Sequence, residues 1–126
     1  MVIIMEVKVG NWKEAKMQDM RAGIRRTLFT GERATVQMSE VQNGHEVTPH
    51  THEYEQIAVV LQGECDFHVA GKVYPMKPGS YVVIPPNVEH NIHVYNSPVP
   101  VINMDVWAPR RDDFVGQYEK FLKEQG

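Results

Sequence analysis

The chain has 126 residues, of which 42% are hydrophobic and 23% charged, and its formal net charge is −3. This length fits one domain, over residues 1–126, with a single hydrophobic core and no room for a second domain. The negative charge and the lack of any basic run argue against nucleic acid or an anionic membrane surface as a partner.

The first residues show no targeting signal. The segment Met1-Val-Ile-Ile-Met-Glu-Val has neither a cationic start nor a small-residue cleavage site, and it predicts a strand. No apolar run approaches the roughly 20 residues that a transmembrane helix needs. Cys65, the only cysteine, can form no intrachain disulfide, and a lone thiol fits a reducing compartment. We therefore expect a cytoplasmic protein.

Short strands are predicted through most of the chain. After a candidate short helix over residues 12–20, alternation of apolar and polar residues dominates from about residue 24 to 108. Turns containing Gly, Asn or Pro divide this region into strands expected at 24–29, 34–41, 56–61, 64–69, 73–76, 81–85, 92–95 and 101–107. Many short strands at regular spacing indicate an all-β sandwich or barrel.

A helix is predicted at the end of the chain, over about residues 112–123. Asp112 or Asp113 can cap its N-terminus. Its apolar side chains follow helical spacing and are Phe114, Val115, Tyr118, Phe121 and Leu122. We expect this helix to pack on the outside of the barrel.

Histidines near the middle of the chain predict a metal site. His50 and His52 lie two residues apart, so on an extended backbone both side chains project to one face and can contact the same ion. Gln56 follows beyond a bend, and His90 follows a Pro-Pro turn. Imidazole ligands that leave other coordination positions of the ion free are typical of transition-metal sites. We predict one divalent transition metal ion per chain (Mn, Fe, Co, Ni, Cu or Zn), with a polar interior lacking an ion as the alternative.

Gln56 is the unusual member of this set, because a carboxylate is the commoner ligand at such a position. A neutral amide leaves the full charge of the ion in place, which predicts a stronger Lewis acid and a lower metal affinity. Glu53 and Glu55 leave an alternative open, in which one of them binds the ion and Gln56 points away. We favour Gln56, together with His50, His52 and His90.

Both segments resemble the two motifs of the cupin superfamily. The first motif, G-x5-H-x-H-x3-E-x6-G, is matched by Gly44, His50, His52, Gln56 and Gly63, and the second, G-x5-P-x-G-x2-H-x3-N, by Gly79, Pro85 and His90. Gln56 replaces Glu, Val94 replaces the final Asn, and Asn87 replaces a Gly whose left-handed backbone Asn also tolerates. The resemblance implies a cupin β-barrel (a double-stranded β-helix or jelly roll) with its core over about residues 24–108.

Residues 23–28, 50–57 and 104–114 are also similar to the small single-domain cupins of the pectin-degradation type. Those proteins act on 4,5-unsaturated uronates released by pectate and alginate lyases and convert the cyclic sugar to its linear ketone. The resemblance implies that Asp105 and Trp107 complete the site as catalytic residues. Period two puts both side chains on one strand face, where Asp105 could shuttle a proton and Trp107 could stack on a sugar. A structural hydrogen-bond acceptor and a core tryptophan are the alternatives.

Several functions remain open at this point. We favour a metal-dependent isomerase or tautomerase with a small anionic substrate. The alternatives are a dioxygenase using Fe or Cu on a phenol or flavonol, and a non-catalytic sensor or binding domain. A homodimer is expected, formed through an edge strand such as residues 2–4.

Other polar residues are weaker candidates. Arg26 could pair with a substrate carboxylate, although a solvated or ion-paired arginine is the commoner case. His45, His68 and His93 lie outside the motif positions, and we expect them at the surface.

Overall fold

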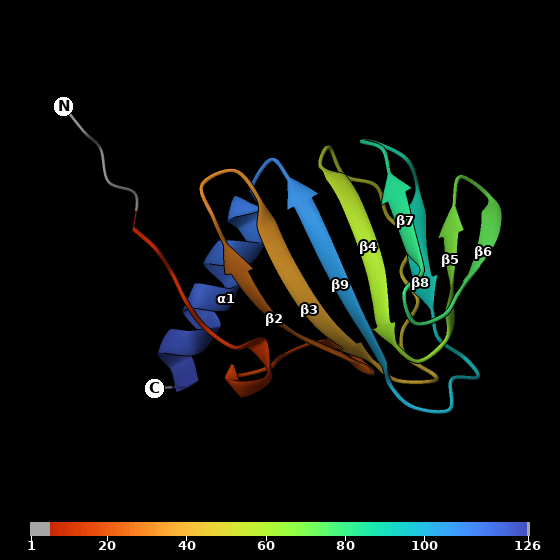
Figure 1. Cartoon of the computed structure of the whole chain (residues 1–126), viewed down its shortest axis with the longest axis horizontal. Helices are drawn as coiled ribbons and strands as arrows, with labels where there is room; N and C mark the ends of the chain where they lie inside the picture. The colour runs from red at the N-terminus through yellow and green to blue at the C-terminus, as the bar shows by residue number, and fades with distance from the viewer. Residues whose placement is uncertain (1–5, 126) are drawn as a thin grey trace.

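The computed structural model describes residues 6–125, and over them it contains nine strands in two antiparallel sheets, a 3₁₀ helix and one α-helix. Among these residues the larger sheet has the strand order β1-β2-β3-β9-β4-β7 and the smaller the order β6-β5-β8 (Figure 1). The strands are β1 Gln18–Arg21, β2 Ile24–Thr30, β3 Thr35–Val41, β4 Glu55–Gln62, β5 Cys65–Val69, β6 Lys72–Met76, β7 Tyr81–Ile84, β8 His90–His93 and β9 Val101–Ala108. The predicted all-β class with a C-terminal helix is confirmed.

The prediction of a helix over residues 12–20 is wrong. The 3₁₀ helix η1 covers only Trp12–Glu14, and the chain then enters β1. Gln18 of β1 pairs with Arg26 of β2 and accepts a hydrogen bond from its Nε at 3.1 Å. The partner strand therefore decides the conformation of a segment that is too short to show a clear period. The strand expected at residues 2–4 lies outside the described residues.

Alternation along the strands builds the core between the two sheets. Its buried apolar members come from both sheets and include Ile24, Val41, Ala58, Val60, Phe67, Ile84 and Val101. Gly63 closes the turn after β4 with φ +80°, and a Cβ there would lie 2.9 Å from Val101 Cγ2. Asn87 has φ 65°, so it adopts the left-handed conformation expected where the motif has Gly.

Strand register aligns the inward-facing polar residues. Gln37 of β3 pairs with Asp105 of β9, and Trp107 of β9 pairs with Gln56 of β4. Asp105 and Trp107 are two residues apart on β9 and therefore face the same side of the sheet. Asp105 and Trp107 thus reach the Gln56 side chain, although they lie 49 and 51 positions further along the chain.

The helix α1, Asp112–Gln125, packs against β2 (Figure 1). Leu28 of β2 forms a small apolar cluster with Val115 and Tyr118, separate from the main core. The Tyr118 hydroxyl donates to the Lys16 carbonyl at 2.7 Å and lies 2.9 Å from Thr27 Oγ1. Helix α1 is thus attached to the barrel through both apolar and polar contacts.

Across residues 6–125, no helix is both long enough and apolar enough to span a bilayer.

Candidate metal centre

His50, His52 and His90 come together although they lie in two separate segments. Each offers one ring nitrogen, and these atoms all lie within 4.8 Å of one another. His50 and His90 form an isolated antiparallel bridge, with N–H···O distances of 3.1 and 3.0 Å between their backbones. The Asn87 N–H donates to the His52 carbonyl at 2.8 Å. Backbone pairing therefore holds the loop before β4 against the β7–β8 turn.

Hydrogen bonds determine which nitrogen each histidine presents. In each histidine Nδ1 lies close to a backbone carbonyl oxygen. The distances are 2.8 Å from His50 Nδ1 to the Thr48 oxygen, 3.0 Å from His52 Nδ1 to the Tyr54 oxygen and 2.8 Å from His90 Nδ1 to the Val88 oxygen. A carbonyl only accepts, so Nδ1 carries the proton and Nε2 presents a lone pair. Burial lowers the pKa of His50, and it lowers that of His90 to about 4. These neutral rings are suited to bind a metal.

Gln56 connects the histidines to β9. Its side chain is buried, and its Oε1 lies 2.8 Å from His52 Nε2 and 3.0 Å from His90 Nε2. The amide orientation follows from two bonds: Gln56 Nε2 donates to Asp105 Oδ1 at 2.8 Å, and Trp107 Nε1 donates to Gln56 Oε1 at 2.9 Å.

These contacts test whether a cation fits the donor set. With each Nδ1 protonated, the Nε2 atoms of His52 and His90 and Oε1 of Gln56 are all acceptors at hydrogen-bond distance, with no proton between them. A metal ion satisfies such a convergence of lone pairs. The histidine cluster is therefore a site for a single metal ion, whose identity the donors leave open. Glu53 and Glu55 are exposed, whereas Gln56 is buried beside the histidines.

Asp105 is a buried carboxyl group beside this cluster. Burial raises its pKa to about 6, against the opposing effects of hydrogen bonds from Asn103 and Gln56 and of the Arg111 charge. Trp107 is also buried, and its ring packs edge-to-face on Phe114 with a centroid distance of 5.3 Å. Both side chains line the same cavity as the histidines.

This cavity has a volume of about 150 Å³ and includes two arginines that the sequence did not single out, Arg21 and Arg111. Arg111 makes a bidentate pair with Asp113, at 3.0 and 2.9 Å, and its guanidinium lies 3.6 Å from the centroid of the Phe114 ring. In the sequence Arg111 is only half of a basic doublet before a helix. Its place in the cavity depends on how α1 packs against the barrel.

Arg26 differs from both expectations for it, since it is neither solvated nor ion-paired among the described residues. Its guanidinium donates to the side-chain oxygens of Gln18, Gln37 and Gln117, each at 3.1 Å. Burial lowers its pKa to about 10. Arg26 is absent from the cavity lining, so its contacts favour a structural role over the candidate contact with a substrate carboxylate.

The expectation that His45 lies at the surface is wrong. Its side chain is buried, the Val94 N–H donates to its Nε2 at 3.0 Å, and its Nδ1 lies 2.8 Å from the Glu46 carbonyl. His45 therefore joins the first-motif loop to the end of β8. His68 and His93 are half-buried, with ring centroids 5.8 Å apart, so neither is fully exposed.

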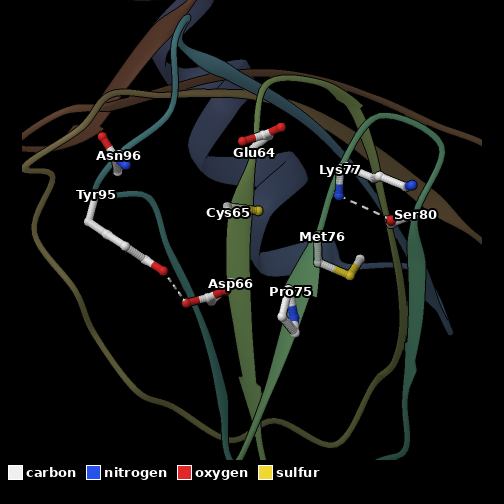
Figure 2. Close-up of a pocket in the computed structure, with 9 residues that line it drawn as sticks. All are labelled: Glu64, Cys65, Asp66, Pro75, Met76, Lys77, Ser80, Tyr95 and Asn96. Atoms are coloured by element: carbon white, nitrogen blue, oxygen red, sulfur yellow. Dashed lines mark hydrogen bonds between the residues drawn. The ribbon is translucent and has the colours of Figure 1, made fainter.

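A larger hollow of about 490 Å³ lies elsewhere, between β5, β6 and the turn before β7 (Figure 2). It contains Asp66, which accepts a hydrogen bond from Tyr95 at 2.8 Å, and Lys77, whose N–H donates to Ser80 Oγ at 3.0 Å. Burial raises the pKa of the Cys65 thiol there to about 12, so this cysteine is not an activated nucleophile. The metal cavity remains the better candidate for chemistry.

The comparisons with known proteins agree with this fold. The family model described as Cupin domain matches residues 37–107. An RmlC-like cupin from Shewanella frigidimarina is 23% identical, with a TM-score of 0.77, over 86% of this chain and 96% of its own. KdgF from Halomonas sp. is 28% identical, with a TM-score of 0.74, over 84% and 99%. The polyketide cyclase RemF from Streptomyces resistomycificus is 22% identical, with a TM-score of 0.69, over 82% and 80%. None of the curated proteins matches the chain.

Proposed function

The chain belongs to the cupin family, and from this premise we propose that it is a metal-dependent enzyme that isomerises an unsaturated uronate, or a similar small sugar-like acid, to its ketone. The observation that carries the proposal is the link made by Gln56. Its oxygen faces the histidine Nε2 atoms, and its amide nitrogen donates to Asp105 at 2.8 Å. A metal site and a proton-transferring group are thereby joined through one side chain.

Asp105 is suited to move a proton in this reaction. Opening an unsaturated cyclic sugar to a ketone takes a proton from the anomeric hydroxyl and breaks the bond between the anomeric carbon and the ring oxygen. A proton is then added to a carbon of the double bond, with no other reactant consumed. A carboxyl group with a pKa near 6 can both accept and release a proton close to neutral pH. A bound divalent ion would supply Lewis-acid stabilisation of negative charge on a substrate oxygen.

The charges around the cavity favour an anionic substrate. Arg21 and Arg111 both line it, and burial keeps His50 and His90 neutral. Among the described residues Arg21 has no ion pair, and Nη1 of Arg111 makes no hydrogen bond. These free N–H groups are suited to bind a carboxylate. Trp107 and Phe114 supply apolar surface for a sugar ring.

The substrate class has support from the resemblance to known cupins as well. The segments that resemble pectin-degradation cupins contain Gln56, Asp105 and Trp107, which are the residues that form the hydrogen-bonded link described above. The likeness to KdgF, at 28% identity over most of both chains, points in the same direction.

The direct test mixes metal-loaded protein with 4,5-unsaturated galacturonate and follows the ultraviolet absorbance of the conjugated double bond. We expect the absorbance to disappear faster than in a protein-free control. Elemental analysis of protein purified without added metal should find about one ion per chain, as one set of converging donors implies. Unchanged decay with metal present would reject this substrate, and oxygen uptake with a phenol would instead favour a dioxygenase.

The role of Asp105 has its own test. Asp105→Asn keeps an oxygen that can accept from Gln56 but removes the titratable proton, so we expect kcat to fall by about 10²–10⁴-fold while the metal content stays unchanged. The matched control is Asp66→Asn in the hollow of Figure 2, which should leave kcat unaltered. Equal activity in the two variants would exclude proton transfer by Asp105.

A further inference from the structure

Asn103 carries a buried oxygen that nothing in the described protein satisfies. The residue lies on β9, is 3% exposed and lines the metal cavity. Its Oδ1 has no hydrogen-bond partner among residues 6–125. A buried acceptor left unpaired is costly, and such groups are rare in native proteins. A side chain of this kind in a cavity wall indicates that a ligand supplies the missing donor.

The neighbours of Asn103 favour a particular orientation of its amide. Asn103 lies two residues before Asp105 on the same face of β9, and both side chains line the cavity. An amide donates through its nitrogen and accepts through its oxygen. The neighbouring Asp105 carboxyl group is an acceptor and so suits the NH₂ end of the amide, and Oδ1 is the end left without a donor.

Ser39 extends the same polar surface. It pairs with Asn103 across β3 and β9 and also lines the cavity. Arg26 donates to Gln37 Oε1 at 3.1 Å, and Gln37 Nε2 donates to Ser39 Oγ at 2.9 Å. Ser39 thus acts as an acceptor towards Gln37, and its hydroxyl proton has no acceptor among the described residues. Asn103 and Ser39 together offer one free acceptor and one free donor.

We propose that Asn103 is a specificity-determining residue whose Oδ1 accepts a hydrogen bond from a hydroxyl group beyond C2 of the bound acid, while the Ser39 hydroxyl donates to an oxygen of the same ligand. Among the oxygen groups of a small sugar-like acid, only a hydroxyl has a proton to offer Asn103, because keto and carboxylate oxygens only accept. The cavity therefore selects carboxylic acids with hydroxyl groups beyond C2 over acids whose chain beyond C2 carries none. This inference deepens the proposed function and rests on it only in taking the ligand to be a small acid.

The test compares two acids with the same four-carbon skeleton and the same 2-hydroxyl group. Threonate carries further hydroxyls on C3 and C4, whereas 2-hydroxybutyrate does not. Isothermal titration of metal-loaded protein should show threonate binding about 10-fold or more tightly, because a site built to pair a hydroxyl discriminates against a ligand that lacks it. Equal affinities in the wild-type protein would overturn the inference, and this result needs no variant.

Asn103→Leu removes the amide at similar size. We expect it to weaken threonate binding about 10-fold or more and to leave 2-hydroxybutyrate within about 3-fold, so that the preference is lost. Asn96→Leu, an exposed change in the hollow of Figure 2, should leave both affinities unchanged. An equal loss for both acids in Asn103→Leu would mean that the residue is only structural.

These outcomes separate the inference from the proposed function. A threonate preference that depends on Asn103, together with no turnover of unsaturated galacturonate, would support the inference and reject that reaction. Turnover of unsaturated galacturonate without any hydroxyl preference would support that reaction and reject the inference.

Discussion

At the scale of single residues, the surroundings of Gln56 explain why an amide and not a carboxylate occupies this position. Its Nε2 donates to a carboxylate oxygen of Asp105 at 2.8 Å, a contact that the carboxylate of Glu could not make. Its oxygen remains available to the metal cluster. The amide thus allows an acidic residue to sit next to the site without repulsion between two negative charges.

Replacing Gln56 tests this explanation. We expect Gln56→Glu to bind a divalent ion more tightly, because it adds a negative ligand, and to lower kcat, because the new carboxylate raises the pKa of Asp105 further. Competition with a chelator measures the affinity, and the pH profile of kcat measures the shift. The control is Glu55→Gln at the exposed neighbour. A lower metal affinity in that control would favour the alternative in which a nearby glutamate is the ligand.

His45 predicts a pH dependence of stability. Burial lowers its pKa from 6.5 in the folded state, and its Nε2 must stay unprotonated to accept from Val94 N–H. The unfolded chain therefore binds more protons below pH 6.5, so the contribution of His45 is present above that pH and is lost as pH falls towards the lowered folded pKa.

Urea unfolding of the wild type and His45→Gln from pH 8 to 5 measures this contribution. The wild type should be more stable by about 1 kcal/mol per lost hydrogen bond at pH 8, and its advantage should shrink below pH 6.5. A difference that does not vary with pH would contradict the assignment.

At the scale of elements, helix α1 does more than cover part of the barrel. The spacing of its apolar residues predicts a helix over about residues 112–123, and the structure has Asp112–Gln125. The existence and position of this helix can therefore be predicted from the sequence. What the spacing did not show is that Arg111, just before the helix, and Phe114, in its first turn, enter the metal cavity. That outcome depends on the contacts of Tyr118 and Val115 with β2.

Tyr118→Phe tests the attachment of α1. It removes the hydroxyl that donates to the Lys16 carbonyl and contacts Thr27 Oγ1, so we expect a loss of about 1–3 kcal/mol in the free energy of unfolding. Metal content should stay the same, because the histidines lie in β8 and in the loop before β4, away from α1. Tyr81→Phe, at a side chain that is 70% exposed, serves as the control and should change stability by less than about 0.5 kcal/mol.

At the scale of the whole molecule, the homodimer stays a prediction. Val7 and Val9 lie two residues apart before η1 and are 84% and 94% exposed. Two valines so exposed are apolar surface that a second copy could cover. Light scattering after size exclusion should give twice the chain mass of 14.5 kDa, and Val7→Asp with Val9→Asp should shift the protein towards monomer. A monomeric mass for the wild type at a protein concentration of about 100 µM would reject the dimer.

The sequence alone determined the fold class and the metal cluster, because both depend on local patterns. Alternation and turn residues specify short strands, and the motif spacing brings His50, His52 and His90 together once the fold forms. Prediction from the sequence failed where the local pattern is weak, at η1 and β1. It also failed where burial depends on packing between distant segments, at Arg26 and His45. Only the tertiary structure decided that Gln56 bonds Asp105, that Arg111 enters the cavity and that Asn103 keeps an unpaired oxygen. Those contacts join residues far apart in the chain, and sheet register and helix packing, not spacing along the chain, bring them together.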